Sequence, residues 1–73
     1  MNSYSYNYNP NHEVEEVKAL GPDYFASLIY KVESRGVRVL DVTKSIVNQF
    51  QFGGTVSQKQ ASVLMNFNRK FGS

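Results

Sequence analysis

The sequence predicts a mostly helical, all-α protein, a small single-domain bundle of three to four short helices behind a disordered N-terminal leader. Apolar residues between positions 24 and 32 recur at helical spacing, and glycine and proline divide the remaining chain into short segments. A serine and a glutamine, at positions 57 and 60, have the spacing of a helix capping box. With 73 residues there is room for one domain, which we place at residues 12–73, after a flexible leader at residues 1–11.

The leader is rich in tyrosine, asparagine and serine. Residues 2–9 have too little aliphatic surface to offset the entropy of ordering, so we expect them to be disordered in isolation. Tyr4, Tyr6 and Tyr8 alternate with polar residues and would share one side of an extended strand. Tyrosine provides a large contact area with few rotors, so a partner could order the leader on binding. A leader without any role is equally consistent with this composition.

A first short helix is expected between Asn11, a suitable N-cap, and a glycine–proline stop at residues 21–22. Its apolar face would be formed by Val14, Val17 and Leu20. Its first turns hold three carboxylates that interact favourably with the helix dipole: Glu13, Glu15 and Glu16. Such a short helix is marginal alone and must pack on the rest of the chain.

The second helix is the clearest. Pro22 and Asp23 begin it, Arg35 is well placed at its negative end, and Gly36 follows that end. Helical spacing predicts one buried stripe, formed by Tyr24, Phe25, Leu28, Ile29 and Val32.

The segment at residues 36–40 alternates in hydropathy like a strand, but the chain offers it no convincing partner strand. We therefore expect a connector whose Val37 and Val39 fill the core. Helical spacing resumes at about Asp41, a plausible N-cap, and ends at the glycine pair 53–54. The apolar face predicted for this third helix comprises Val42, Ile46, Val47 and Phe50, with Lys44, Ser45 and Asn48 facing outward.

The last helix begins with the capping box, in which Ser57 and Gln60 satisfy each other's free backbone donors. Val56 and Ala61 have the spacing of a hydrophobic staple. The residues expected to run along the packed face are Ala61, Leu64, Met65, Asn68 and Phe71, with Phe67 beside them. The final turn carries Arg69 and Lys70, where cations are favoured.

Composition argues against catalysis. The chain has no cysteine, which excludes disulfides, thiolate metal sites and a cysteine nucleophile. His12 is the only histidine, so no histidine pair can bind a metal or relay protons. Glu15 and Glu16 are adjacent and would point about 100° apart on a helix. No glycine pattern matches a phosphate-binding loop. We expect a binding protein without cofactor, metal or small-molecule substrate.

No apolar run approaches the length of a membrane span, and no signal pattern precedes the domain. We therefore expect a cytoplasmic protein with no membrane partner. Charge is uneven along the chain. Residues 1–30 carry one base against four acids, a net −3, and residues 31–73 carry seven bases against two acids, a net +5. Such asymmetry can steer association with a charged partner, although two ordinary solvated faces would give the same count.

One alternative is a helix-turn-helix formed by residues 41–51 and 57–71. The helix beginning at Ser57 would then read DNA with residues near its N-terminus: Gln58, Lys59, Gln60 and Ser62. Any helical hairpin in a small bundle has this outline, and Gln60 is also needed by the cap. A structural or virion component is a third alternative, which predicts self-association and no host partner.

The chain resembles the small RNA-polymerase-binding transcription regulators of lytic Xanthomonas phages. The resemblance lies in length, in the tyrosine-rich leader and in the lack of cysteine, and it runs from MNSYSYNYNPNHEVEEV through GGTVSQKQASVL to RKFGS. Separately, the GxxSxKQxxxL pattern ending at Leu64 resembles a helical-hairpin motif of phage and bacterial DNA-metabolism proteins. That motif indicates a piece of fold and no activity.

The resemblance implies a protein of the infected bacterial cytoplasm that binds host RNA polymerase near the N-terminal region of its β′ subunit. It implies inhibition of initiation at host promoters and read-through of intrinsic terminators. The family has no short motif that assigns contact residues, so we nominate two surfaces on physical grounds. The first is the leader with the acidic first turn: Tyr4, Tyr6, Tyr8, Glu13, Glu15 and Glu16. The second is a basic set that could also lie against nucleic acid in the transcription complex: Arg35, Arg38 and Lys44.

Overall fold

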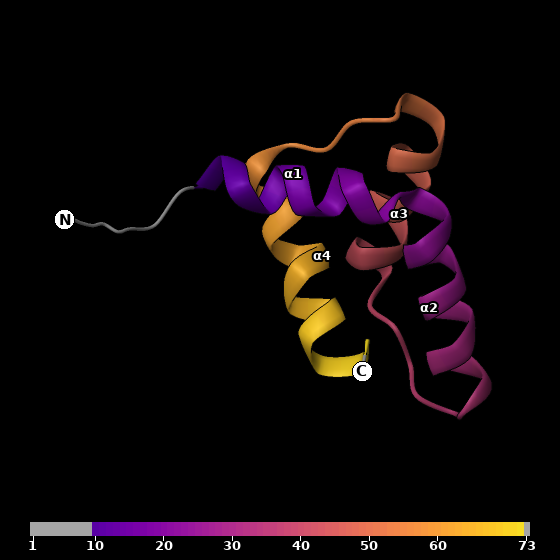
Figure 1. Ribbon diagram of the computed structural model, residues 1–73. Coiled ribbons are helices and arrows are strands. Elements are labelled where there is room, and N and C mark those ends of the chain that lie inside the picture. Colours follow the sequence, from indigo (N-terminus) through magenta and orange to yellow (C-terminus); the bar gives the residue numbers. More distant parts are fainter. Residues whose placement is uncertain (1–9, 73) are drawn as a thin grey trace, which may run out of the picture.

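The computed structural model describes residues 10–72, which form four helices and no strand (Figure 1). The helices are α1 (Pro10–Leu20), α2 (Pro22–Ser34), α3 (Asp41–Gly53) and α4 (Gln58–Phe71). The all-α fold class is confirmed, and the strand-like alternation at residues 36–40 belongs to a connector. The predicted end of the leader at residue 11 falls inside α1, and residues 1–9 lie outside the described residues.

Within residues 10–72, no helix combines the length and the apolar character that crossing a membrane requires.

Both α2 and α4 contact each of the other three helices, whereas α1 and α3 do not contact each other. In Figure 1, α1 lies across the upper end of α4, while α2 and α4 both descend to the lower end of the molecule. The turn from α1 to α2 is a single residue, Gly21, whose φ of +89° lies in the left-handed region that favours glycine. Its N–H donates to the carbonyl of Val17 at 3.0 Å, which closes α1 before Pro22 begins α2.

A single core takes side chains from all four helices and from the connector. The five largest side chains that are fully buried come from α1, α2, α3 and α4: Val17, Phe25, Val32, Phe50 and Leu64. The predicted stripe of α2 is confirmed at Phe25, Leu28, Ile29 and Val32, which are buried, and Tyr24 lies half-buried beside them. The hydroxyl of Tyr24 donates to the side-chain oxygen of Asn68 and so joins α2 to α4.

The apolar face predicted for the third helix was wrong at its first turn. Val42 is 55% exposed, whereas Thr43 is 5% exposed and takes the buried position instead. Asp41 is the first residue of α3, not its N-cap; Leu40 is the N-cap and offers no side-chain acceptor. Without a cap that fixes where the helix begins, the first-turn residue that faces the core depends on how α3 packs against α2 and α4.

The connector fills the core with one valine only. Val39 is 3% exposed, as predicted, but Val37 is 42% exposed and does not belong to the core. Two predictions for the first helix also need correction. Leu20 is 40% exposed because it stands at the turn, and α1 begins at Pro10, so Asn11 lies inside the first turn and is not its N-cap.

The turn between α3 and α4 is held by two local devices. Gly54 adopts a left-handed φ of +73° and donates its N–H to the carbonyl of Phe50 at 2.8 Å. The predicted capping box is confirmed: Ser57 Oγ accepts from the N–H of Gln60 at 3.2 Å, and Gln60 Oε1 accepts from the N–H of Ser57 at 2.9 Å. These contacts determine where α4 starts and therefore which of its faces enters the core.

Leu64→Ala should lower the free energy of unfolding by about 2–5 kcal/mol, because it removes a fully buried side chain and leaves a cavity. In a domain of this size that is a large part of the total stability. Leu40→Ala is the matched control, since the same truncation at a side chain 66% exposed should change stability by no more than about 0.5 kcal/mol. Urea unfolding followed by circular dichroism measures both. Equal effects would contradict the core described above.

Ser57→Ala should cost about 1 kcal/mol, because it leaves the Gln60 N–H without its capping acceptor. Ser45→Ala, at an exposed position inside α3, should be neutral or slightly stabilising, since alanine is the better helix former. The midpoint of thermal unfolding distinguishes the two variants. A loss of the same size at both positions would contradict a specific role for the cap.

Candidate functional site

Glu13, nominated for partner binding, is engaged inside the protein. Its side chain is 15% exposed, and Oε1 accepts a hydrogen bond of 2.7 Å from the hydroxyl of Ser62. Oε2 lies 3.5 Å from Nη2 of Arg69. Both partners belong to α4, so this carboxylate fastens α1 to α4 at two points and has little surface left for another protein.

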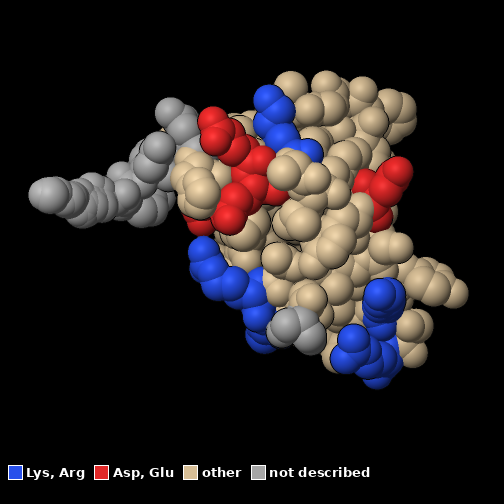
Figure 2. Space-filling model, viewed as in Figure 1, with Lys and Arg blue, Asp and Glu red and all other residues tan. Residues whose placement is uncertain are grey.

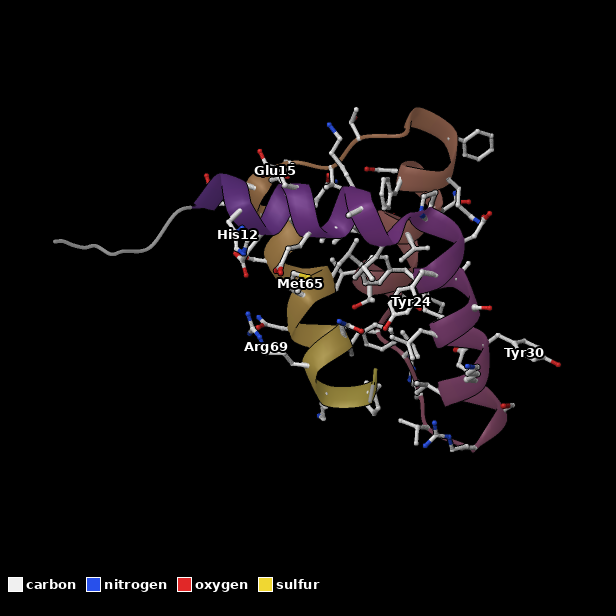
Figure 3. The ribbon with its side chains drawn as sticks, in the orientation of Figure 1. His12, Glu15, Tyr24, Tyr30, Met65 and Arg69 are labelled. Atoms are coloured by element: carbon white, nitrogen blue, oxygen red, sulfur yellow. The ribbon has the colours of Figure 1, made fainter. Side chains whose placement is uncertain are left out.

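The remaining members of the acidic surface do not form one patch. Glu16 is half-exposed and lies 3.5 Å from the imidazole of His12, one helical turn away. Figure 3 shows Glu15 on the upper side of α1 and His12 on the side toward α4. Glu15 and Glu16 therefore remain accessible but face in different directions. Tyr4, Tyr6 and Tyr8 lie outside the described residues.

The nominated basic set is also divided. Nζ of Lys44 lies 2.7 Å from Oε2 of Glu33, which joins the first turn of α3 to the last turn of α2. Arg35 and Arg38 are exposed and form no ion pair with any residue between 10 and 72. Figure 2 shows basic side chains at the lower end of the molecule, where no acidic side chain is visible, and also at the upper end beside the acidic ones over α1. The charges are therefore only partly separated: the lower end is basic, whereas acidic and basic side chains lie together at the upper end.

A groove at this basic end brings together two segments far apart in the sequence. It has a volume of about 460 Å³ and lies between residues 37–43 and the second half of α4, from Val63 to Phe71. In Figure 1 these segments are the connector after α2 and the lower half of α4. We call it the connector groove. Its buried floor contains Val39 and Phe67, and its more exposed apolar walls contain Val37 and Leu40.

Two bases lie on the walls of the connector groove and no carboxylate does, among the described residues. Arg38 comes from the connector and Lys70 from the last turn of α4. Neither forms an ion pair within residues 10–72, and Nζ of Lys70 lies 5.4 Å from the centre of the Phe71 ring. The groove therefore combines an apolar floor with positive charge that nothing in this part of the chain neutralises.

The groove is also lined by a threonine whose hydroxyl has no hydrogen-bond partner among residues 10–72. Thr43 is 95% buried and lines the groove, and its side chain makes no hydrogen bond to the rest of residues 10–72. Because Thr43 lines a groove that water can enter, water is the ordinary partner of this hydroxyl when the groove is empty. A polar atom of a bound molecule would take the place of that water.

The proposed DNA-reading end of α4 is largely occupied by contacts within the protein. Gln60 belongs to the capping box, and its Nε2 also donates to Oε1 of Gln49 at 3.1 Å. Ser62 donates to Glu13. Only Gln58 and Lys59 of the four predicted residues are exposed and make no hydrogen bond within the described chain. The acidic first turn of α1 beside Ser62 is also an unfavourable neighbour for phosphates.

Within residues 10–72, no three histidine, aspartate or glutamate side chains gather in a way that could hold a metal ion.

The connector groove was missed by the sequence analysis, apart from Arg38. Lys70 was assigned to the helix end and Phe71 to the packed face, although Phe71 is only half-buried. The available signal was the apolar run at residues 37, 39 and 40 beside Arg38, more apolar surface than a five-residue connector can bury. Nothing in the sequence indicated that this surface would face the end of α4.

Neither the family models, nor the curated proteins, nor the solved structures contain a match to this chain.

Glu13→Ala should destabilise the protein by about 1–2 kcal/mol, because Ser62 loses the charged acceptor of its hydrogen bond. The loss should be concentrated in α1, where amide hydrogen exchange should accelerate more than in α2 or α3. Glu15→Ala makes the same change on the exposed side of the same helix and should alter stability by at most about 0.5 kcal/mol. Uniform acceleration of exchange across all four helices in Glu13→Ala would contradict a local fastening role.

Proposed function

We propose that this protein is a phage-encoded transcription regulator that binds host bacterial RNA polymerase. It inhibits initiation at host promoters and promotes read-through of terminators. The sequence resemblance supplies the identity of the partner. The observation that carries the proposal is the connector groove, a surface with an apolar floor and uncompensated bases, suited to docking on another protein.

The exposed apolar side chains support a protein partner. Leu40 is 66% exposed and Val37 42%, and both line the groove. Two large aromatic residues outside it are also exposed, Tyr30 at 75% and Phe52 at 87% (Tyr30 is labelled in Figure 3). Interfaces are enriched in aromatic residues and arginine. A regulator of this kind acts by occupying polymerase surface, which requires complementarity and no chemical step.

The contacts with polymerase are proposed at both ends of the molecule. The basic end contributes Arg35, Arg38 and the connector groove. In the transcription complex, this end also lies against nucleic acid. The acidic end contributes Glu15 and Glu16, with the leader tyrosines before them. Lys44 and Glu13 support these surfaces indirectly, because each is paired with a residue of another helix.

Affinity capture tests the proposal. The full chain is immobilised and exposed to bacterial lysate treated with nuclease, and then to purified RNA polymerase core. Polymerase should be retained in both cases. The double variant Gln58→Ala/Lys59→Ala, which removes the accessible part of the DNA-reading end, should retain it equally well.

Two outcomes would contradict the proposal. Loss of every partner on nuclease treatment, together with binding of duplex DNA that weakens steeply with salt, would favour the DNA-reading alternative. Retention of polymerase without any effect on transcription would contradict the regulatory part of the proposed function. That part is measured with purified polymerase on a template carrying a promoter and an intrinsic terminator. Initiated transcripts should decrease, and the fraction reading through the terminator should increase.

A further inference from the structure

We propose that the connector groove is the docking site for an acidic amphipathic helix of the partner, with about two turns inserted. Only one part of this proposal rests on the proposed function, namely that the helix belongs to RNA polymerase. It identifies the chemistry of the segment that this end of the protein recognises.

The size and shape of the groove match a short helix. The wall from α4 extends from Val63 to Phe71, which corresponds to about 12 Å along the helix axis at 1.5 Å per residue. Two helical turns have nearly the same length. The opposite wall is the connector with the start of α3, so the groove lies between two elements and can take apolar side chains spaced at i, i+3 and i+4.

The open side of the groove favours a macromolecule over a small ligand. Small-molecule sites enclose most of their ligand, whereas the walls here include Leu40, 66% exposed, and Val37, 42% exposed. A partner helix would cover these side chains with its apolar face and leave its other face in solvent. The burial of apolar surface in that arrangement provides the main free energy of docking.

The basic residues that line the connector groove determine which charge the partner helix should carry. Arg38 and Lys70 stand on opposite walls, no acidic residue of the described chain lines the groove, and neither base is neutralised there. Arg35, exposed at the end of α2, adds a third positive charge near the same end. Glutamate or aspartate flanking the apolar positions of the helix would pair with these bases, whereas lysine or arginine would be repelled.

Thr43 gives the groove a polar contact at its floor. Its hydroxyl lacks a hydrogen-bond partner among residues 10–72, and the side chain is almost entirely buried. A polar side chain of the helix, placed between its apolar anchors, would satisfy it. Replacement by valine keeps the shape and removes the hydroxyl.

The direct test uses a labelled amphipathic peptide of about 14 residues, with leucine at helical i, i+3, i+4 and i+7 and glutamate at most other positions. A matched control peptide replaces the glutamates with lysine. Added to the isotope-labelled full chain, the acidic peptide should shift amide resonances within residues 37–43 and 63–71, and the basic peptide should not. Equal shifts with both peptides, or shifts confined to other residues, would overturn the proposal. A single-stranded oligonucleotide that produced the same shifts more strongly would overturn it in favour of nucleic acid.

Variants test the residues by fluorescence anisotropy. Arg38→Glu/Lys70→Glu should weaken binding of the acidic peptide at least about tenfold, as two attractions become repulsions. Lys31→Glu/Lys59→Glu, at exposed bases outside the groove, should weaken it by no more than about threefold. Leu40→Ser should weaken it more than Val42→Ser, an exposed apolar residue that does not line the groove. Thr43→Val should weaken binding without unfolding the protein. The proposal would be overturned if Arg38→Glu/Lys70→Glu and Leu40→Ser bound the acidic peptide as well as their respective controls.

Capture experiments separate this inference from the proposed function. If the wild-type chain retains polymerase and Arg38→Glu/Lys70→Glu retains it equally, the groove inference fails and the function stands. If the wild-type chain retains no polymerase but binds the acidic peptide at the groove, the function fails and the groove inference stands. Loss of polymerase in the groove variant alone supports both.

Discussion

The structure depends on one small core to which every helix contributes. The fully buried side chains Val17, Phe50 and Leu64 come from α1, α3 and α4, and Phe25 from α2, so no pair of helices has a core of its own. A domain of this size buries a limited fraction of its surface and, with no cysteine, has no disulfide to support it. The polar contacts at its periphery, above all those of Glu13, therefore serve to hold helices in place around that core.

The elements that could be predicted are those with a local cause. The stripe of α2 and the capping box at Ser57 depend on residues within one or two turns, and both are confirmed. Which residue in the first turn of α3 faces the core could not be derived in the same way. A stripe through Ile46, Val47 and Phe50 admits either Val42 or Thr43 in the first turn, because the two flank the same helical face. The choice is made by the neighbouring helices, which select the less apolar of the two residues.

Less of the candidate site could be predicted. The basic lower end agrees with the excess of bases in the second part of the sequence, and Arg38 was nominated as part of a basic set. The groove itself is a product of tertiary structure. Its two walls are at least twenty residues apart in the sequence, and the features of each have an ordinary local explanation, a helix end for Lys70 and a connector for Val37. Pair contacts such as Lys44 with Glu33 have the same origin, since they arise only when α2 and α3 are packed.

The contact between α1 and α4 has a consequence for how the chain reaches its native state. Glu13 meets Ser62 and Arg69 across 49 and 56 residues, so this contact closes the longest loop in the described chain. Closing long loops costs entropy before the contact contributes anything in return, and α1 is too short to persist alone. During synthesis α1 leaves the ribosome before α2, α3 and α4, yet α4, to which it is fastened, follows the other three. Of these four helices, the first to be synthesised is therefore among the last to be placed, because its position is fixed only once α4 is available.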